Sequence, residues 1–285
     1  SGCGKSILSK SIIKLLPEKI SKLSSGEVIF DGKRIDTLNE KQLLDIRGND
    51  IAMIFQEPMT ALNPVFTIKN QLVESIKSHK KISKKEANNL AKDLLKKVGI
   101  ARQDEILNSY PHQLSGGMRQ RVMIAMAISC SPKLLIADEP TTALDVTIQA
   151  QILDLLKELQ KETQMAIMMI THDLSVVAEF CDKVLVMYAG QIVEFGGIKE
   201  ILHNPKHPYT QKLLSTIPKL KEGQKRLETI EGIVPSIQAF HVNKCRFANR
   251  CNKKLDICNN QSPKMHVCED VIVRCHLYKN EYKEI

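Results

Sequence analysis

The sequence predicts an α/β protein built around a parallel β-sheet that is covered by helices on both faces. Three runs are almost continuously apolar, as are strands that are buried on both faces; they are Lys133–Asp138, Met165–Thr171 and Lys183–Tyr188. Segments with apolar residues at helical spacing separate such runs, for example Val146–Lys161. Buried strands that alternate with helices are typical of a parallel sheet.

The first elements along the chain are shorter. Apolar residues at helical spacing follow the opening residues and stop at Pro17, which predicts a helix. Residues 27–35 predict a pair of strands that turns at Asp31-Gly32. Ile51–Phe55 predicts a short buried strand that ends at Gln56.

From Thr67 to about Ser129 the pattern predicts helices. One helical face between residues 84 and 100 is apolar, and it consists of Ala87, Leu90, Ala91, Leu94, Leu95 and Val98. After Gly196 the pattern loosens, and residues 223–226 are typical of a linker.

Composition restricts the classes of protein to which the chain can belong. Its 285 residues, 43% hydrophobic and 26% charged, are typical of a globular protein and exclude a disordered one. The longest apolar stretches, such as Val122–Ile128, are too short to span a bilayer, so we expect a cytosolic chain. The net charge of +9 suits nucleic acid, an anionic membrane surface or nucleotides, and equally a lysine-rich solvated surface.

The chain opens with Ser-Gly-Cys-Gly-Lys-Ser, the latter half of a phosphate-binding loop pattern. Gly2 and Gly4 let backbone N–H groups turn toward phosphate oxygens, and Cys3 contributes a further N–H. Lys5 is suited to neutralise phosphates, and Ser6 to bind Mg²⁺. For this stretch alone, the alternative is a glycine-rich entry to a helix.

A pair of acidic residues follows the apolar run 134–137. Such a strand buries everything except its terminal carboxylates. Asp138 can then hold Mg²⁺ through water, while Glu139 polarises an attacking water. Two adjacent acids after a strand are often only part of a solvated loop, and the phosphate loop upstream is what favours the catalytic interpretation.

Ser115, Gly116 and Gly117 predict a second anion-binding terminus. Ser115 is a good N-cap, and the two glycines expose backbone donors at the start of a helix. Two such termini cannot easily serve one nucleotide within one monomer. A dimer in which each chain covers the triphosphate of the other explains both.

Together these motifs resemble the nucleotide-binding subunit of ATP-binding cassette (ABC) transporters. The set comprises GKS at 4–6, Gln56 after a strand, LSGGMRQR at 114–121, LLIADEP at 134–140, TTALD at 141–145 and ITHD at 170–173. It covers roughly residues 1–200 in the family's order and spacing. The resemblance implies a P-loop NTPase fold with a helical subdomain at about 67–130, and ATP hydrolysis in a head-to-tail dimer that drives a permease.

The resemblance also implies a role for each matching residue. Phosphate contacts are expected from Gly2, Cys3, Gly4 and Lys5, and Mg²⁺ contacts from Ser6, Gln56 and Asp138. Glu139 is the expected catalytic base, His172 contacts the γ-phosphate and the attacking water, and Gln56 reports the nucleotide state to the permease. Contacts across the dimer are expected from Ser115, Gly116, Gly117 and Asp145.

Finer similarity points to importers of oligopeptides, dipeptides and nickel. The stretches that carry it are FQEPMTALNP at 55–64, SGGMRQRVMIAMA at 115–127, CDKVLVMYAGQ at 181–191 and HPYTQKLL at 207–214. Pro208 by itself predicts only a proline in a first helical turn. The resemblance implies a second ABC ATPase subunit in a hetero- or homodimer, two transmembrane permease subunits and an extracytoplasmic peptide-binding protein. It implies no nucleic acid, and a peripheral location on the cytoplasmic side of the plasma membrane.

A cysteine-rich extension, expected at 231–285, follows a linker at 201–230. Its candidate metal ligands are Cys245, Cys251, Cys258 and Cys275, with Cys268 as an extra thiol. The spacing lacks the close pairs of structural zinc sites, although four thiolates can surround an iron–sulfur cluster. The tail resembles that of the same importer subunits, in which this spacing is associated with a [4Fe-4S] cluster in some members. A cluster, a zinc ion and free thiols all remain open, and PSIQAFHVNKC at 235–245 departs from the family's proline-rich approach.

Two other functions compete with that of an importer ATPase. One is a soluble ABC-type ATPase that acts on ribosomes or DNA, which the positive charge would suit; tandem cassettes or long coiled coils, usual in such proteins, do not occur in this sequence. The other is a binding module without catalysis. Family members place a strand pair, an adenine-stacking aromatic residue and the first loop glycine before the position of Ser1, so we expect the stretch as given to bind ATP weakly or not at all.

Overall fold

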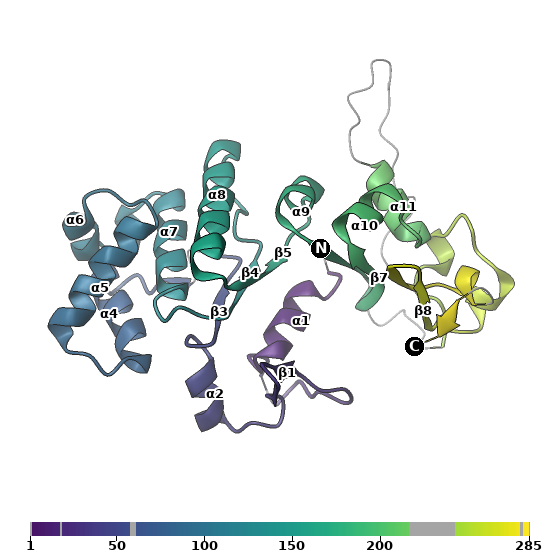
Figure 1. The fold of residues 1–285 in the computed structure, drawn as a ribbon, viewed down its shortest axis with the longest axis horizontal. Coiled ribbons are helices and arrows are strands. Elements are labelled where there is room, and N and C mark those ends of the chain that lie inside the picture. The colour runs from purple at the N-terminus through teal and green to yellow at the C-terminus, as the bar shows by residue number, and fades with distance from the viewer. Residues whose placement is uncertain (1, 18, 58–60, 217–242, 280–281, 285) are drawn as a thin grey trace, which may run out of the picture. The chain divides into compact units, whose positions relative to one another are not determined.

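Three parallel strands form one sheet, in the order β3 (Ile51–Ile54), β4 (Leu134–Asp138) and β5 (Ala166–Ile170). The computed structural model describes residues 2–17, 19–57, 61–216, 243–279 and 282–284. The chain divides into two compact units, Ser6–Thr171, which contains this sheet, and Ser1–Lys5 with His172–Ile285 (Figure 1). The parallel sheet predicted from the apolar runs is confirmed for these three strands.

The strand register places the carboxyl ends of the sheet together. Ile54 pairs with Ala137, and Asp138 pairs with Ile170. All three strands therefore end at one edge of the sheet. Gln56 follows β3 there, Asp138 is the last residue of β4, and Glu139 comes directly after it. Ligand sites of open parallel sheets lie at this edge.

Helices and a hairpin complete the unit Ser6–Thr171. The hairpin joins β1 (Ile29–Phe30) and β2 (Lys33–Arg34) antiparallel through the turn at Asp31-Gly32, as predicted. Helix α1 (Lys5–Ile12) ends before the predicted stop at Pro17, and α2 (Glu40–Ile46) starts from a capping box at Asn39. The core between these elements and the sheet is a cluster of isoleucines, Ile13, Ile35, Ile51, Ile136 and Ile170.

The predicted helical segment forms α4 (Ile68–His79), α5 (Lys84–Lys97), α6 (Gln103–Asn108), a 3₁₀ turn (Pro111–Gln113) and α7 (Gly116–Ala127). These helices form one group in Figure 1. The apolar face predicted on α5 is buried, except for Leu90, which is half-buried; the buried residues are Ala87, Ala91, Leu94, Leu95 and Val98. Helices in this segment that follow a serine or threonine are capped by its side chain, as Thr67 caps α4 and Ser83 caps α5.

The second unit is built on a five-stranded antiparallel sheet in the order β10-β8-β9-β7-β6. Its strands are β6 (Lys183–Tyr188), β7 (Gln191–Gly197), β8 (Met265–Cys268), β9 (Val271–Arg274) and β10 (Lys283–Glu284). The prediction that 183–188 belongs to the parallel sheet is wrong. Only Ala189 and Gly190 connect β6 to β7, and a two-residue connection can join strands only in antiparallel pairing.

Short helices and 3₁₀ turns accompany this antiparallel sheet in the described part of the unit. The helices are α9 (Leu174–Phe180), α10 (Ile198–His203) and α11 (Pro208–Ser215), with 3₁₀ turns at Ala248–Arg250, Asp256–Asn259 and His276–Tyr278. The core includes Tyr188, Val193, Ile201, Phe247 and Val271. Pro208 lies in the first turn of α11, as predicted, whereas the predicted linker at 223–226 lies outside the described residues.

The start of α11 is fixed by a buried pair of ionisable residues. The Nδ1 atom of His207 accepts a hydrogen bond from Tyr209 N at 3.0 Å, and His207 N donates to Glu194 Oε2 at 3.1 Å. His207 and Glu194 are 2% and 0% exposed. Burial lowers the pKa of His207 to about 4 and raises the pKa of Glu194.

We predict that His207 makes the protein less stable as the pH falls. The unfolded histidine binds a proton near pH 6.5, while the folded one does so only near pH 4, so stability is lost as the pH drops through this window. The loss reaches up to about 3 kcal/mol. His207→Asn keeps a helix cap without the titration, and urea unfolding at several pH values should show a flatter dependence. The exposed His203→Asn is the control, and an equal slope in His207→Asn and the parent protein would contradict the assignment.

Candidate functional site

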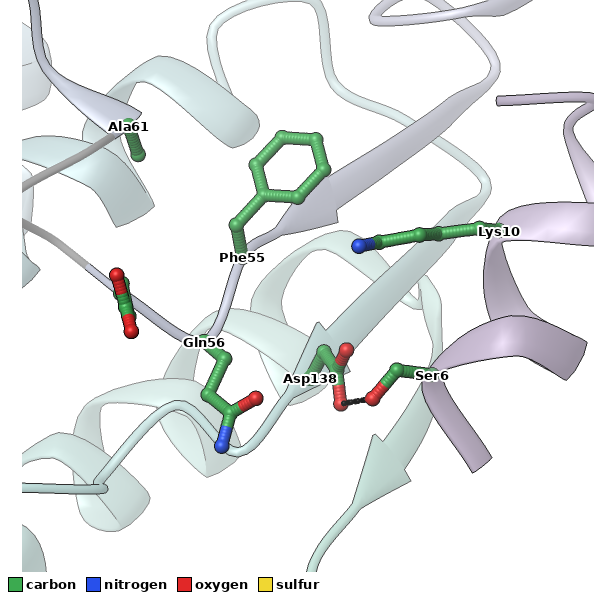
Figure 2. Close-up of a pocket in the computed structure, with 7 residues that line it drawn as sticks. Ser6, Lys10, Phe55, Gln56, Ala61 and Asp138 are labelled. Atoms are coloured by element: carbon green, nitrogen blue, oxygen red, sulfur yellow. Dashed lines mark hydrogen bonds between the residues drawn. The ribbon is translucent and has the colours of Figure 1, made fainter. Parts of the chain in front are cut away.

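A cavity of about 550 Å³ opens at the carboxyl edge of the parallel sheet. It is lined by Ser6, Lys10, Phe55, Gln56, Glu57, Ala61 and Asp138 (Figure 2). Ser6 and Lys10 lie one turn apart on α1 and so share a helix face. The strand ends of β3 and β4 supply the opposite walls. The fold therefore brings the predicted residues Ser6, Gln56 and Asp138 into one cavity.

The side-chain oxygen atoms of Ser6 and Asp138 meet in the lining of this cavity. Ser6 Oγ donates a hydrogen bond to Asp138 Oδ1 at 3.1 Å (Figure 2). Octahedral Mg²⁺ holds oxygen ligands at about 2.0–2.1 Å, so that two adjacent ligands lie about 3 Å apart. Asp138 is only 2% exposed, and a buried carboxylate beside a hydroxyl suits a hard cation. This pair of residues therefore fits Mg²⁺ in both spacing and donor chemistry.

Gln56 and Thr142 hold the carboxylate of Glu139. Gln56 Nε2 and Thr142 Oγ1 each donate to Glu139 Oε2 at 3.0 Å. The backbone is fixed as well, because Glu139 N donates to Ile170 O at 2.9 Å. Glu139 adopts a left-handed conformation with φ 48°, which costs about 1 kcal/mol or more in a residue other than glycine. The surrounding contacts offset this strain and fix the direction of the side chain.

Thr142 and Lys10 were not predicted from the sequence as part of this site. Thr142 belongs to a motif that the resemblance includes, but a threonine in a loop carries no signal for a particular partner. Lys10 follows Ser6 by four residues, and helical spacing could have placed it on the same face. In Figure 2 its ammonium group points into the space beside Phe55.

The two predicted contact points for a partner chain both start helices in the unit Ser6–Thr171. Ser115 is the N-cap of α7 and accepts a hydrogen bond from Met118 N at 3.3 Å, as predicted for a capping serine. Asp145 is the N-cap of α8 (Val146–Thr163) and accepts from Ile148 N at 2.9 Å. Ser115 and Gly116 are exposed, whereas Gly117 packs so closely on Ile148 that an added Cβ would lie 2.8 Å from its Cγ2.

The other predicted residues belong to the second compact unit. Gly2 and Gly4 have φ values of 82° and 88°, which L side chains rarely adopt, and Cys3 and Lys5 stand next to Gly4. His172 is exposed and precedes α9. The structure therefore unites Ser6, Gln56, Asp138 and Glu139 in one site within the unit Ser6–Thr171. Gly2–Lys5 and His172 belong to the other compact unit.

Comparison with known proteins identifies the family. Residues 1–142 match the family model for ABC transporters, and residues 193–258 match that for the oligopeptide/dipeptide transporter C-terminal region. A probable peptide ABC transporter ATP-binding protein of Sinorhizobium fredii is 51% identical over 92% of this chain and 78% of its own length. The chain belongs to the ABC transporter ATPase family.

Other relatives of this ABC ATPase extend the similarity over the whole chain. The dipeptide transport ATP-binding protein DppD of Bacillus subtilis is 49% identical over 95% of this chain and 80% of its own length. The oligopeptide transport ATP-binding protein AppD of the same organism is 48% identical over 100% and 87%.

Solved structures of other ABC ATPases share the fold. The cassette MJ0796, solved as a dimer in a post-hydrolysis state with ADP and Pi, superposes with a TM-score of 0.60 at 30% identity, over 69% of this chain and 81% of its own. The protein cbiO1 of Clostridium perfringens gives a TM-score of 0.61 at 32% identity, over 72% and 76%. The P-loop NTPase fold that the motifs implied is thus confirmed.

The candidate ligands in the cysteine-rich tail of this ABC ATPase influence one another electrostatically. Burial raises the pKa of Cys275 to about 12, and the charges of Cys245, Cys251 and Cys258 add to the effect. Burial likewise raises the pKa of Cys245 and Cys251. Within the part of the chain that the structure describes, however, no three His, Cys, Asp or Glu side chains are placed to hold one metal ion.

No described helix combines the length and the apolar character that a membrane crossing requires. The longest of these, α8, has 18 residues and carries charged side chains throughout its second half, from Asp154 to Glu162.

We predict that Thr142 positions the carboxylate of Glu139 in this ATPase. Thr142→Val removes the hydrogen bond from Thr142 Oγ1 to Glu139 Oε2 and should lower kcat roughly fivefold to tenfold without changing ATP affinity. Thr142→Ser keeps the hydroxyl and should retain most of the activity. The neighbouring Thr141→Val serves as the control. Steady-state ATPase kinetics decide the matter, and a wild-type kcat in Thr142→Val would exclude this role.

Proposed function

We propose that the chain is the ATP-hydrolysing subunit of an ABC importer that takes up peptides. The observation that carries the proposal is the geometry at the end of β4, where Asp138 faces Ser6 and Glu139 is held by Gln56 and Thr142. The match of residues 193–258 to the oligopeptide/dipeptide transporter region supports peptides as the transported class.

The residues divide the chemistry of hydrolysis between them. Ser6 and Asp138 would hold Mg²⁺ at the phosphates, with the amide oxygen of Gln56 as a third ligand. The bound metal would neutralise charge that develops on the phosphate oxygens. Glu139 accepts the proton of the attacking water through one of its carboxylate oxygens, Oε1. The hydrogen bonds from Gln56 and Thr142 fix the other oxygen, Oε2.

Gln56 connects this site to the rest of the transporter in our proposal. Its amide nitrogen donates to Glu139 Oε2, and its side chain lines the same cavity as Ser6 and Asp138. A displacement of Gln56 would therefore change the metal site and the base at once. This supports a role for Gln56 in reporting nucleotide state to a permease.

The remaining contacts to nucleotide are proposed from the motif match. Gly2, Cys3, Gly4 and Lys5 would bind the phosphates, and His172 the γ-phosphate and the attacking water. Ser115, Gly116 and Gly117 would contact nucleotide on a partner ATPase subunit, and Asp145 would lie at the same interface. The exposed start of α7 supports this assignment, because its backbone donors are accessible to a partner's ligand.

We propose the assembly that peptide importers of this family imply. It contains a second ABC ATPase subunit, two transmembrane permease subunits and an extracytoplasmic peptide-binding protein, with this chain peripheral on the cytoplasmic side of the membrane. The soluble alternative, an ATPase acting on ribosomes or DNA, has less support, because the relatives reported above are transport proteins by name.

We predict that Glu139→Gln in the full-length protein retains ATP binding and loses most hydrolysis. The amide keeps the shape of the side chain but cannot accept the proton of the water. Loss of about 10²-fold or more in kcat is expected of a removed general base. Binding is measured with a fluorescent ATP analogue and turnover by phosphate release. Glu179→Gln, a change in an exposed glutamate of α9, is the control, and undiminished turnover in Glu139→Gln would exclude the assignment.

For the tail we propose a [4Fe-4S] cluster, with zinc and free thiols as the alternatives. The electrostatic influence of Cys245, Cys251 and Cys258 on Cys275 supports it, while the placement of the side chains does not, as described above. A metal would have to displace the thiol protons and draw the sulfur atoms inward. No step of the ATPase reaction depends on this group.

We predict iron and acid-labile sulfide in equal amounts in anaerobically purified protein. Cys275→Ser should abolish both, because the other three thiols cannot complete the coordination. Cys130→Ser, which lies outside the tail, should leave them unchanged. A colourless protein with stoichiometric zinc would establish zinc instead, and one without metal would establish free thiols.

A further inference from the structure

We propose that Arg246 of the cysteine-rich tail is a positioning residue for the phosphate loop. It acts through the turn between β6 and β7, which touches both the loop and the tail. The proposal rests on the proposed ATPase function, and it gives the tail a part in nucleotide binding whether or not a metal is present. All the residues involved belong to one compact unit, Ser1–Lys5 with His172–Ile285.

The first contact joins the turn to the loop. Gly190 N donates a hydrogen bond to Cys3 O at 3.0 Å. Gly4 lies beside the same turn, since an added Cβ would be in ordinary van der Waals contact with Gly190 Cα at 3.6 Å. The turn thus holds one carbonyl of the loop and packs against its second glycine.

The second contact joins the turn to the tail. Arg246 Nη1 donates a hydrogen bond to Ala189 O, and an added Cβ on Gly190 would lie 3.2 Å from the same nitrogen. Ala189 and Gly190 have φ values of 49° and 76°. A non-glycine residue in this left-handed region is under strain, so the charged hydrogen bond at its carbonyl helps to hold the turn in place.

The backbone of Arg246 is fixed on both sides. Cys245 N donates to Cys258 O at 3.1 Å, and Phe247 is 2% exposed. The ring of Phe247 packs edge-on against Tyr188, the last residue of β6, with centroids 5.1 Å apart. The backbone from which the Arg246 guanidinium reaches the turn is therefore held in place by its neighbours.

A further ring extends the aromatic cluster around Phe247. Tyr209 packs against Tyr188 and Phe247, with centroids 4.8 and 5.5 Å away. Burial raises the pKa of Tyr209, as expected for a phenol enclosed in such a cluster. The aromatic cluster thus fixes Phe247, the residue that follows Arg246, against the end of β6.

These contacts bear on nucleotide affinity because the loop is rich in glycine. A loop with Gly2 and Gly4 loses much conformational entropy when its N–H groups converge on phosphates. A turn that already holds Cys3 O reduces that loss before the nucleotide arrives. Removal of Arg246 should therefore weaken nucleotide binding and leave the chemical step unchanged.

The test uses Arg246→Met in the full-length protein, with Arg246→Lys and Lys244→Met alongside. Lysine keeps a charged donor for Ala189 O, and Lys244 is an exposed neighbouring cation of the tail. We expect Arg246→Met to raise both the Kd of a fluorescent ATP analogue and the KM for ATP about fivefold, with kcat unchanged. Arg246→Lys should restore most of the affinity, and Lys244→Met should match the parent protein.

Thermal unfolding curves show whether each variant is folded, so that a loss of affinity in a folded variant can be assigned to positioning of the loop. If Arg246→Met unfolds, Arg246→Lys and Arg246→Gln, which keep donors, replace it, and the affinity should fall in the order Arg, Lys, Gln. An unchanged Kd in folded Arg246→Met, or an equal loss in Lys244→Met, would overturn the proposal. A parent protein that binds ATP without hydrolysing it would refute the proposed function alone, and one that binds no nucleotide would refute both.

Discussion

Parallel pairing of β4 with β3 on one side and β5 on the other is the constraint on which the catalytic site depends. It brings the residues after β3 and those at the end of β4 to one edge, although 83 positions separate Gln56 from Glu139. Ser6 reaches the same edge from α1 and bonds to Asp138, 132 positions away. These contacts between residues distant in sequence exist because the strands pair in this register. A shift of β4 by one residue relative to its neighbours would displace both Asp138 and Glu139 from their partners.

The end of β4 shows how a strand delivers two carboxylates in different directions. Asp138 is the last residue of the strand and is buried against Ser6. Glu139 leaves the strand in a left-handed conformation, which turns its side chain toward Gln56 and Thr142. Strained residues persist where the surroundings fix them, and such places are often functional sites. The backbone bond to Ile170 supplies part of that fixation from β5.

Much of this site was predictable from the sequence, because the motifs lie at the ends of strongly apolar strands. The predicted strands at 51–55, 133–138 and 165–171 all exist, and Ser6, Gln56, Asp138 and Glu139 meet as the parallel sheet requires. The segment 183–188 was assigned to the wrong sheet, because a buried apolar run does not reveal its neighbours. The two-residue connection at Ala189-Gly190 was the signal that could have corrected it.

The position of the tail was beyond sequence reasoning for a different physical reason. Strand β9 pairs with β7 across Glu194↔Val273 and Phe195↔Ile272, contacts that span most of the second unit's length in sequence. Pairing between distant strands leaves no local pattern, and the cysteines drew attention to metal chemistry instead. The pairing makes the tail part of the same sheet as the turn at Ala189-Gly190. The turn at Ala189-Gly190 contacts the phosphate loop, and strands β8 and β9 of the tail lie in the same sheet as this turn. A change in the packing of these strands would therefore affect the turn, whatever the thiols of the tail bind.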